Sequence, residues 1–175
     1  NFIMEELEAT KMLGSNYLQI DDGWQSGRSQ NSAYKGGSSE NIWDREGYWE
    51  VHPEKFPDGL DPVIKKAEQA GIGISLWYSP SIGDAYKDWK QDAMTLTRLF
   101  TDYGITKMKV DLLKLNDKLS ETRIRKMLDY CYEHTDHELS FDLDITANRR
   151  FGYHYFNEYG VYWVANRYTD WGNYY

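Results

Sequence analysis

The feature that most constrains the fold is a recurring unit in which a helix is followed by glycine, a short apolar strand and a polar loop. Four stretches fit it: "EELEATKMLGSNYLQIDDGW", "DPVIKKAEQAGIGISLWYSP", "QDAMTLTRLFTDYGITKMKVD" and "YFNEYGVYWVANRYTD". A fifth helix, "SETRIRKMLDYCYEHTDH", leads without glycine to "ELSFDLDIT". Glycine at these positions is typical of a helix C-terminus, where the backbone turns left-handed. The alternation predicts an α/β fold whose parallel strands are joined by right-handed crossovers.

Five short strands are expected from this pattern, apolar on both faces and covered on both sides of the sheet. Their predicted ranges are 17–20, 72–77, 106–110, 139–143 and 161–165. A long insertion rich in Gly, Ser and Trp, residues 21–60, separates the first two strands. A loop of this length inside a compact domain is usually functional, although its part "SQNSAYKGGSSEN" is also compatible with a disordered tip.

Charge and composition exclude several classes of partner. The 175 residues fit one domain, and the 28 acidic against 20 basic residues argue against binding to nucleic acid. Apolar runs fall far short of the roughly 20 residues of a membrane span, so no membrane partner is expected. The single cysteine, Cys131, rules out an internal disulfide and a cysteine-based zinc cluster. The four histidines show no ligand spacing, and we expect no metal and no cofactor.

Carboxylates gather at the predicted strand ends, which is where parallel α/β folds carry their active sites. One Asp after a strand is ordinarily the N-cap of the next helix, and Asp-Asp-Gly is common in turns. Their coincidence at several strand ends favours a functional site instead. The acids at strand ends are Asp21, Asp22, Asp111, Asp142, Asp144 and Asp170, accompanied by the aromatic residues Trp24, Trp77, Tyr78 and Trp171.

The stretch "ITKMKVDLLK" places Lys109 two positions before Asp111, so both side chains should lie on one face of a strand. The pattern alone leaves a structural ion pair and a catalytic pair open. Convergent carboxylates and aromatic rings, without a phosphate loop or a Ser-His pairing, suit glycoside hydrolysis. That chemistry needs one carboxylate as nucleophile and another as acid and base. Spacing by itself is compatible with any α/β enzyme.

Three stretches together carry a resemblance to a known family: "YLQIDDGWQ", "GYWEVHPEKFPDGLDPVIKKAEQAGIGISLWYSP" and "ITKMKVD". The chain resembles the retaining α-galactosidases of glycoside hydrolase family 36 and their clan D relatives over nearly its whole length. The resemblance implies a (β/α)8 TIM barrel. Residues 1–175 would form a single, partial catalytic barrel domain with about strands two to six. A barrel removes sheet edges only by closing, so we expect further domains of a longer chain, or a partner copy, to cover the open edges.

The resemblance also implies roles for individual residues. Asp111 would be the nucleophile, Lys109 would contact sugar hydroxyls, and Asp21 and Asp22 would bind two hydroxyls of a galactose-like ring. Asp170 would be the acid and base. The remaining expected substrate contacts are Trp24, Trp77 and Arg167.

The chain departs from the family pattern after the fifth barrel strand. A segment that is usually rich in Cys and Gly is replaced by "FDLDITANRR", which leaves the exact glycoside open. Asp142, Asp144, Arg149 and Arg150 stand where other sugar contacts would lie. The spacing around Asp170 also differs, and Asp144 is therefore a second candidate for the acid.

The sequence thus predicts a retaining, exo-acting glycoside hydrolase that removes terminal α-linked galactose from oligosaccharides or glycoconjugates without a cofactor. One alternative is a clan relative that acts on another α-glycoside or transfers galactose. Another is a truncated, non-catalytic carbohydrate-binding fragment. In a third, Lys109 is the general base of a proton-abstracting barrel enzyme with acidic metal ligands at neighbouring strand ends.

Overall fold

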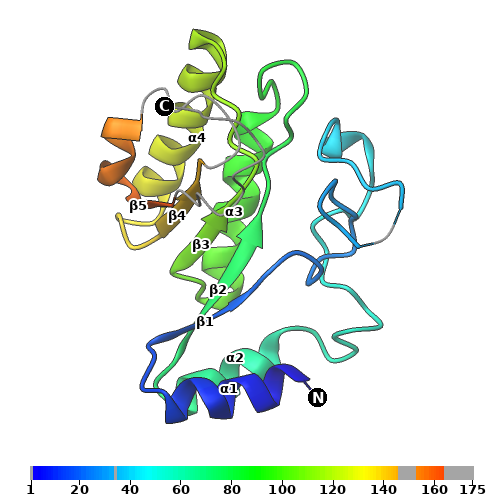
Figure 1. The fold of residues 1–175 in the computed structure, drawn as a ribbon, viewed down its shortest axis with the longest axis vertical. Helices are drawn as coiled ribbons and strands as arrows, with labels where there is room; N and C mark the ends of the chain where they lie inside the picture. The colour runs from blue at the N-terminus through cyan, green and yellow to red at the C-terminus, as the bar shows by residue number, and fades with distance from the viewer. Residues whose placement is uncertain (1, 34, 146–152, 164–175) are drawn as a thin grey trace, which may run out of the picture.

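The computed structural model of the chain describes residues 2–33, 35–145 and 153–163. Its centre is a parallel five-stranded sheet whose strands lie side by side in chain order, β1-β2-β3-β4-β5 (Figure 1). A doubly wound sheet would reverse its strand order at a switch point, whereas barrel strands follow one another as these do. The strands are β1 (Tyr17–Ile20), β2 (Gly73–Tyr78), β3 (Lys107–Val110), β4 (Ser140–Asp144) and β5 (Gly160–Trp163).

Within the described residues, four α-helices and two short 3-10 helices precede or connect the strands. Figure 1 shows α1 and α2 side by side at one end of the molecule, while α3 and α4 pack against each other along the sheet. In the part of the chain that the structure describes, no helix is long and apolar enough to cross a membrane. The helices are α1 (Phe2–Met12), η1 (Ile42–Asp44), α2 (Asp61–Gln69), α3 (Trp89–Tyr103), α4 (Lys118–His134) and η2 (Tyr153–Glu158).

The predicted strands are found within one residue of their expected bounds, except that the predicted end of the fifth strand, residues 164 and 165, lies outside the described residues. The expectation of two apolar faces is wrong for β3 and β4. In both strands buried and half-exposed residues alternate. Right-handed crossovers between successive neighbours all place their helices on the same side of the sheet, and in β3 and β4 that side carries the buried apolar residues. The buried side chains are Met108, Val110, Phe141 and Leu143, and those on the opposite face are Lys107, Lys109, Asp142 and Asp144.

Glycines follow the helices for two different reasons. Gly14, Gly71 and Gly104 have φ angles of 69°, 71° and 65°, the left-handed conformation expected at helix C-termini. Gly160 instead begins β5 after η2, which is a 3-10 helix rather than the expected α-helix. A Cβ at Gly160 would lie 2.1 Å from the carbonyl oxygen of Phe141, so the close approach of β4 requires glycine there.

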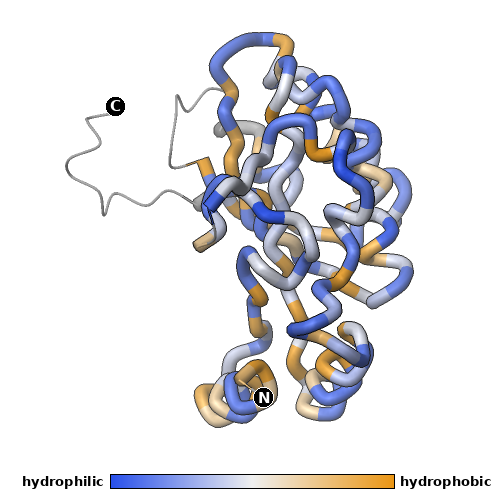
Figure 2. Tube along the Cα trace, turned by 90° about the vertical axis from the view of Figure 1, so that its right-hand side faces the viewer, coloured by the Kyte–Doolittle hydropathy of each residue, from blue (hydrophilic) through white to orange (hydrophobic). Residues whose placement is uncertain are grey.

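The insertion between β1 and β2 folds over the carboxyl ends of the strands. An antiparallel bridge joins Gln25 to Val51, and the backbone N–H of Ser38 donates to the carbonyl of Arg28 at 2.9 Å. Ser29 and Ser39, near the two ends of the expected disordered tip, are fully buried, whereas most of the described residues between them are exposed. Figure 2 shows hydrophobic stretches in the helices at the N-terminal end and in the strands, whereas most loops are hydrophilic.

Candidate active site

Asp111 follows β3 directly, and three donors hold its carboxylate. Oδ2 accepts from Trp77 Nε1 at 3.1 Å and from Asn31 Nδ2 at 3.3 Å. Oδ1 accepts from the backbone N–H of Leu112 at 2.6 Å. The backbone N–H of Asp111 donates to the carbonyl of Tyr78 at 2.9 Å and so continues the pairing of β3 with β2. Partners that only donate fit an ionised carboxylate, which is the form that a nucleophile needs.

Lys109 lies on the same face of β3 and forms an ion pair across β2. Its Nζ is 3.0 Å from Asp21 Oδ2, at the end of β1, and that oxygen also accepts from Gln19 Nε2 at 3.0 Å. The side chain of Asp21 is 54% exposed, so the pair adds little to stability. The ion pair matters for the geometry of the site, because it fixes an ammonium group and a carboxylate beside Asp111.

Asp22 is held by side chains of the insertion. Its Oδ1 accepts from Gln25 Nε2 and its Oδ2 from Ser29 Oγ, each at 2.7 Å. Gln25 and Ser29 are both buried, so the two donors are fixed in place. Asp22 itself is half-buried and stands next to Asp21 at the end of β1. The two neighbouring carboxylates are therefore held by different partners, Asp21 by the sheet and Asp22 by the insertion.

The aromatic residues form a buried layer beneath these carboxylates. Trp24 and Trp77 are both fully buried, and Trp24 Nε1 donates to the carbonyl of Trp77 at 2.8 Å. Trp49 of the insertion stacks on Tyr78 with ring centroids 4.0 Å apart and also contacts Trp24 and Trp77. Trp77 thus reaches the site through its indole N–H, whereas Trp24 supports Trp77 from behind.

Four residues that support the candidate site or its surroundings were not predicted from the sequence. They are Gln25, Ser29 and Asn31 of the insertion, and Asp92 of α3. The sequence feature that could have indicated the first three as site residues is their position in a long polar loop that starts at a strand end. Asp92 resembled an ordinary acid in the first turn of a helix, yet it is fully buried. Burial raises the pKa of its carboxyl to about 7.

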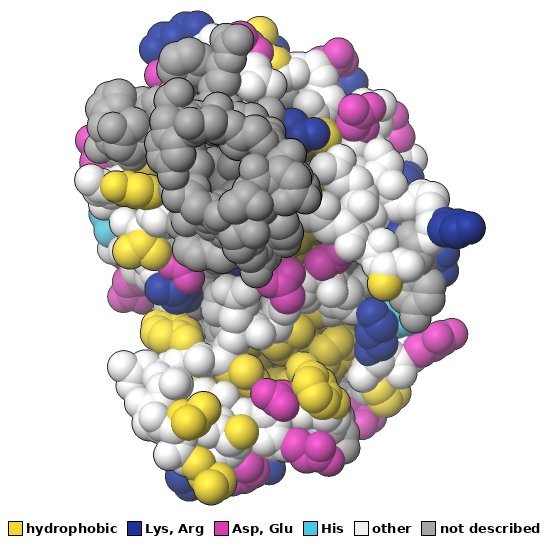
Figure 3. Space-filling model, viewed as in Figure 1, with side chains coloured by type: hydrophobic (Ala, Val, Ile, Leu, Met, Phe, Trp, Pro, Cys, Tyr) yellow, Lys and Arg dark blue, Asp and Glu magenta, His cyan; other side chains and the backbone are white. Residues whose placement is uncertain are grey.

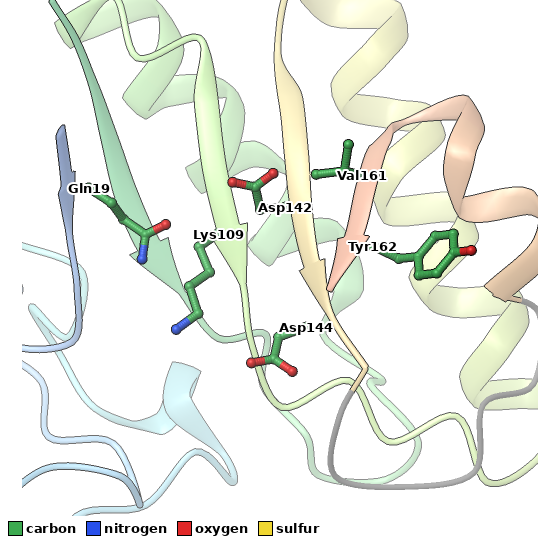
Figure 4. Close-up of a pocket in the computed structure, with 6 residues that line it drawn as sticks. All are labelled: Gln19, Lys109, Asp142, Asp144, Val161 and Tyr162. Atoms are coloured by element: carbon green, nitrogen blue, oxygen red, sulfur yellow. The ribbon is translucent and has the colours of Figure 1, made fainter. Parts of the chain in front are cut away.

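A cavity of about 330 Å³ opens on the polar face of the sheet beside Lys109. Figure 4 shows the side chains of Lys109 and Asp144 extending from neighbouring strands on this side. Lys107 Nζ lies 3.2 Å from Asp142 Oδ1 on the same face. The lining residues are Gln19, Lys109, Asp142, Asp144, Val161 and Tyr162.

A second cavity, of about 540 Å³, lies beside β1. Figure 3 shows hydrophobic side chains gathered between the two N-terminal helices and the rest of the molecule. Phe2, Ile20 and Phe56 line this cavity together with Asp21 and Asp22, so it reaches the same strand end.

Several expected site residues lie outside the described residues. They are Asp170, Arg167, Arg149 and Arg150. The structure brings together Asp21, Asp22, Trp77, Lys109 and Asp111, with Asp144 on the neighbouring strand. No group of three or more His, Cys, Asp or Glu side chains suited to a metal ion occurs within residues 2–33, 35–145 and 153–163.

No family model matches the chain, but individual relatives do. An α-galactosidase from Escherichia coli is 30% identical over 82 residues, which is 47% of this chain and 10% of that protein. The chain therefore spans about a tenth of the length of this curated relative. This match confirms the resemblance to α-galactosidases over that part of the chain.

Solved structures show the same relationship at the level of the fold. One described as a putative α-galactosidase from Bacteroides fragilis superposes with a TM-score of 0.60 over 94% of this chain and 34% of that chain, at 16% identity. A family 36 α-galactosidase from Geobacillus stearothermophilus, solved with raffinose, gives a TM-score of 0.57 over 81% and 25%, also at 16% identity. These likenesses confirm the barrel type of α/β fold that the sequence predicts.

Proposed function

We propose that these residues form part of the catalytic barrel of a retaining glycoside hydrolase that removes terminal α-linked galactose. The observation that carries the proposal is the carboxylate of Asp111, fixed by three donors at the end of β3 beside the pair of Lys109 and Asp21. The likeness to α-galactosidases supports the choice of sugar.

In the first step, Asp111 attacks the anomeric carbon while an acid protonates the leaving oxygen. In the second step, the same acid acts as a base and deprotonates the water that releases the sugar. The donors on Asp111 keep the carboxylate in one orientation, which reduces the entropy lost on reaching the transition state. We assign the acid to Asp170, with Asp144 as the second candidate.

The polar groups around Asp111 suit the hydroxyls of a sugar ring. Lys109 is a donor, while Asp21 and Asp22 are acceptors whose orientations are fixed by their own hydrogen bonds. A hydroxyl both donates and accepts, so a mixed set of fixed donors and acceptors can distinguish its orientation on the ring. We propose that these three residues bind the sugar hydroxyls, that Trp77 and Trp24 shape the pocket, and that Arg167 adds a further contact.

The test is the Asp111→Asn variant of the full-length protein, assayed with nitrophenyl α-galactoside. We expect the rate to fall by at least about 1,000-fold, because the amide is no nucleophile. Asp102→Asn, an exposed change on α3, serves as the control and should keep the wild-type rate. Wild-type turnover in the Asp111→Asn variant would refute the assignment. Proton NMR of the first sugar released by wild type should show the α anomer, and the β anomer would exclude a retaining mechanism.

A second candidate is a clan relative that acts on another α-glycoside or transfers galactose. Asp142 and Asp144 favour it, because both carboxylates line the cavity beside Lys109 in place of the usual Cys- and Gly-rich segment. A panel of nitrophenyl α-glycosides, with and without a sugar acceptor, distinguishes these activities. Sugar binding by calorimetry without turnover on any of them would instead indicate a carbohydrate-binding fragment.

A further inference from the structure

Leu112, the residue after Asp111, has a backbone conformation that leucine rarely adopts. Its φ angle is 58°, in the left-handed region that side chains with a Cβ disfavour. The backbone N–H of the same residue donates to Asp111 Oδ1 at 2.6 Å. The position of the Leu112 backbone therefore helps to orient the Asp111 carboxylate.

A single hydroxyl holds the turn that contains Leu112. The hydroxyl of Tyr86 donates to the carbonyl of Leu112 at 2.9 Å and accepts from the backbone N–H of Lys114 at 2.5 Å. It thereby joins both ends of the segment 112–114. Tyr86 is buried, and burial raises the pKa of its phenol well above the ordinary value, so the hydroxyl keeps the proton that it donates.

Tyr86 itself projects from a strained turn that another element secures. Asp84, Ala85 and Tyr86 have φ angles of 47°, 53° and 59°, three consecutive residues with a Cβ in the left-handed region. Arg123 of α4 donates through Nη1 to the carbonyl of Asp84 at 2.6 Å and to that of Ala85 at 3.2 Å. Such strain persists only where the surroundings determine the conformation, and it tends to occur at functional sites.

These contacts form a continuous path from α4 to the carboxylate. Arg123 fixes the turn 84–86, the turn presents Tyr86, and Tyr86 fixes Leu112. Leu112 in turn holds Oδ1 of Asp111, whereas Oδ2 is held separately by Trp77 and Asn31. The two carboxylate oxygens are thus restrained by different parts of the chain. Loss of the Tyr86 hydroxyl would remove from this path the donor to the Leu112 carbonyl.

We propose that Tyr86 is a positioning residue, whose hydroxyl keeps the Asp111 carboxylate oriented for attack on the anomeric carbon. The inference rests on the proposed function, because it assumes that Asp111 is the nucleophile. Tyr86 contacts the backbone rather than the reacting atoms. Loss of its hydroxyl should therefore weaken the chemical step and leave substrate binding largely intact.

The Tyr86→Phe variant of the full-length protein tests this role with nitrophenyl α-galactoside. We expect kcat to fall by roughly 10- to 100-fold while KM stays within about twofold, because a misplaced nucleophile slows attack without changing the contacts to sugar hydroxyls. Tyr159→Phe is the matched control. Its hydroxyl is also buried and donates to Asp129 Oδ1 at 2.5 Å, a contact outside the path to Asp111. Its kcat should equal that of wild type.

A wild-type kcat in a folded Tyr86→Phe variant would overturn the proposal, and so would an equal fall in kcat for Tyr159→Phe. Should Tyr86→Phe fail to fold, Arg123→Met replaces it, because methionine carries no N–H donor for the turn 84–86 and Tyr86 stays in place. A lower kcat at constant KM in that variant supports the role, whereas wild-type kinetics overturn it. Activity that survives Asp111→Asn would refute the proposed function itself. An inactive Asp111→Asn beside a fully active Tyr86→Phe would refute only the positioning role.

Discussion

Replacing Asp92 with asparagine changes a buried carboxylate that connects three segments of the chain. The carboxylate accepts hydrogen bonds from the Tyr78 hydroxyl at 2.9 Å, from Trp43 Nε1 at 3.1 Å and from the backbone N–H of Ser81 at 3.1 Å. Tyr78 ends β2, Trp43 belongs to the insertion, and Ser81 lies in the loop after β2. Asparagine keeps the shape but carries only one acceptor oxygen.

Burial raises the pKa of Asp92 from 3.8 to about 7, because the loss of hydration outweighs the three hydrogen bonds that favour the charged form. The folded protein thus keeps a proton that the unfolded chain releases near pH 4. Protonation of Asp92 therefore stabilises the fold fully below about pH 4, and this stabilisation is lost as the pH rises through about 7. The rise in pKa corresponds to about 4 kcal/mol over that range.

The variant should respond differently to pH, because an amide does not titrate. At pH 5, we expect the free energy of unfolding of Asp92→Asn to be about 2 kcal/mol lower than that of wild type, since the NH2 group of asparagine would face a buried donor. The difference should shift by about 3 kcal/mol in favour of the variant between pH 5 and pH 8, as wild type loses the stabilisation from its proton, so the variant should be the more stable protein at pH 8 by about 1 kcal/mol. Urea unfolding followed by tryptophan fluorescence at several pH values measures this.

Gln91→Ala is the control for this experiment. Gln91 is adjacent to Asp92 on the chain, exposed and uncharged, so the Asp92 carboxyl stays in place. The difference in unfolding free energy between Gln91→Ala and wild type should not change with pH in the same range. If the difference for Asp92→Asn is also constant from pH 5 to pH 8, Asp92 does not titrate there, and the three donors outweigh burial.

Three further changes test the packing and the site. Gly160→Ala should lower the free energy of unfolding by about 2 kcal/mol, because its Cβ would lie 2.1 Å from the Phe141 carbonyl; an unchanged urea midpoint would contradict this. Ala85→Gly should raise that free energy by up to about 1 kcal/mol, since glycine adopts a φ of 53° without strain, and a clear loss would argue against strain there. Ser29→Ala should raise KM several-fold in the full-length enzyme by releasing Asp22 Oδ2, and an unchanged KM would show that this hydrogen bond is not needed to orient Asp22.

The strands were predictable because their signals are local. β1 has the predicted bounds, since "YLQI" lies between Gly14 and Asp21, and within the described residues the other strands differ from prediction by one residue. The two faces of the sheet were predicted less well. "KMKV" and "SFDLD" alternate visibly in polarity, but whether the polar side meets helices or solvent depends on where the crossovers lie. The sequence predicts Gly160 as a helix C-cap, but glycine is required there because a carbonyl of the neighbouring strand leaves no room for a Cβ.

The candidate site was predictable where strand ends supply it and unpredictable where folding brings distant segments together. Lys109 and Asp111 follow from a two-residue period on one strand. Asn31, by contrast, contacts Asp111 across 80 positions of sequence, and Tyr86 contacts Leu112 across 26. The local sequence around a polar loop residue does not indicate which strand end that residue will contact. Such partners become visible only when the register of the sheet and the path of the insertion are known.

The structure separates the restraints on Asp111 into two groups. Oδ2 is held from the side of the insertion, by Asn31 and by Trp77, and the insertion is itself tied to α3 through Asp92 and Trp43. Oδ1 is held from the opposite side, through Leu112 and the Tyr86 hydroxyl. A change in one group leaves the other in place, so each should reduce catalysis only in part, and their combined loss should exceed either alone. The nucleophile would thus be positioned by the tertiary fold around the strand end, rather than by β3 itself.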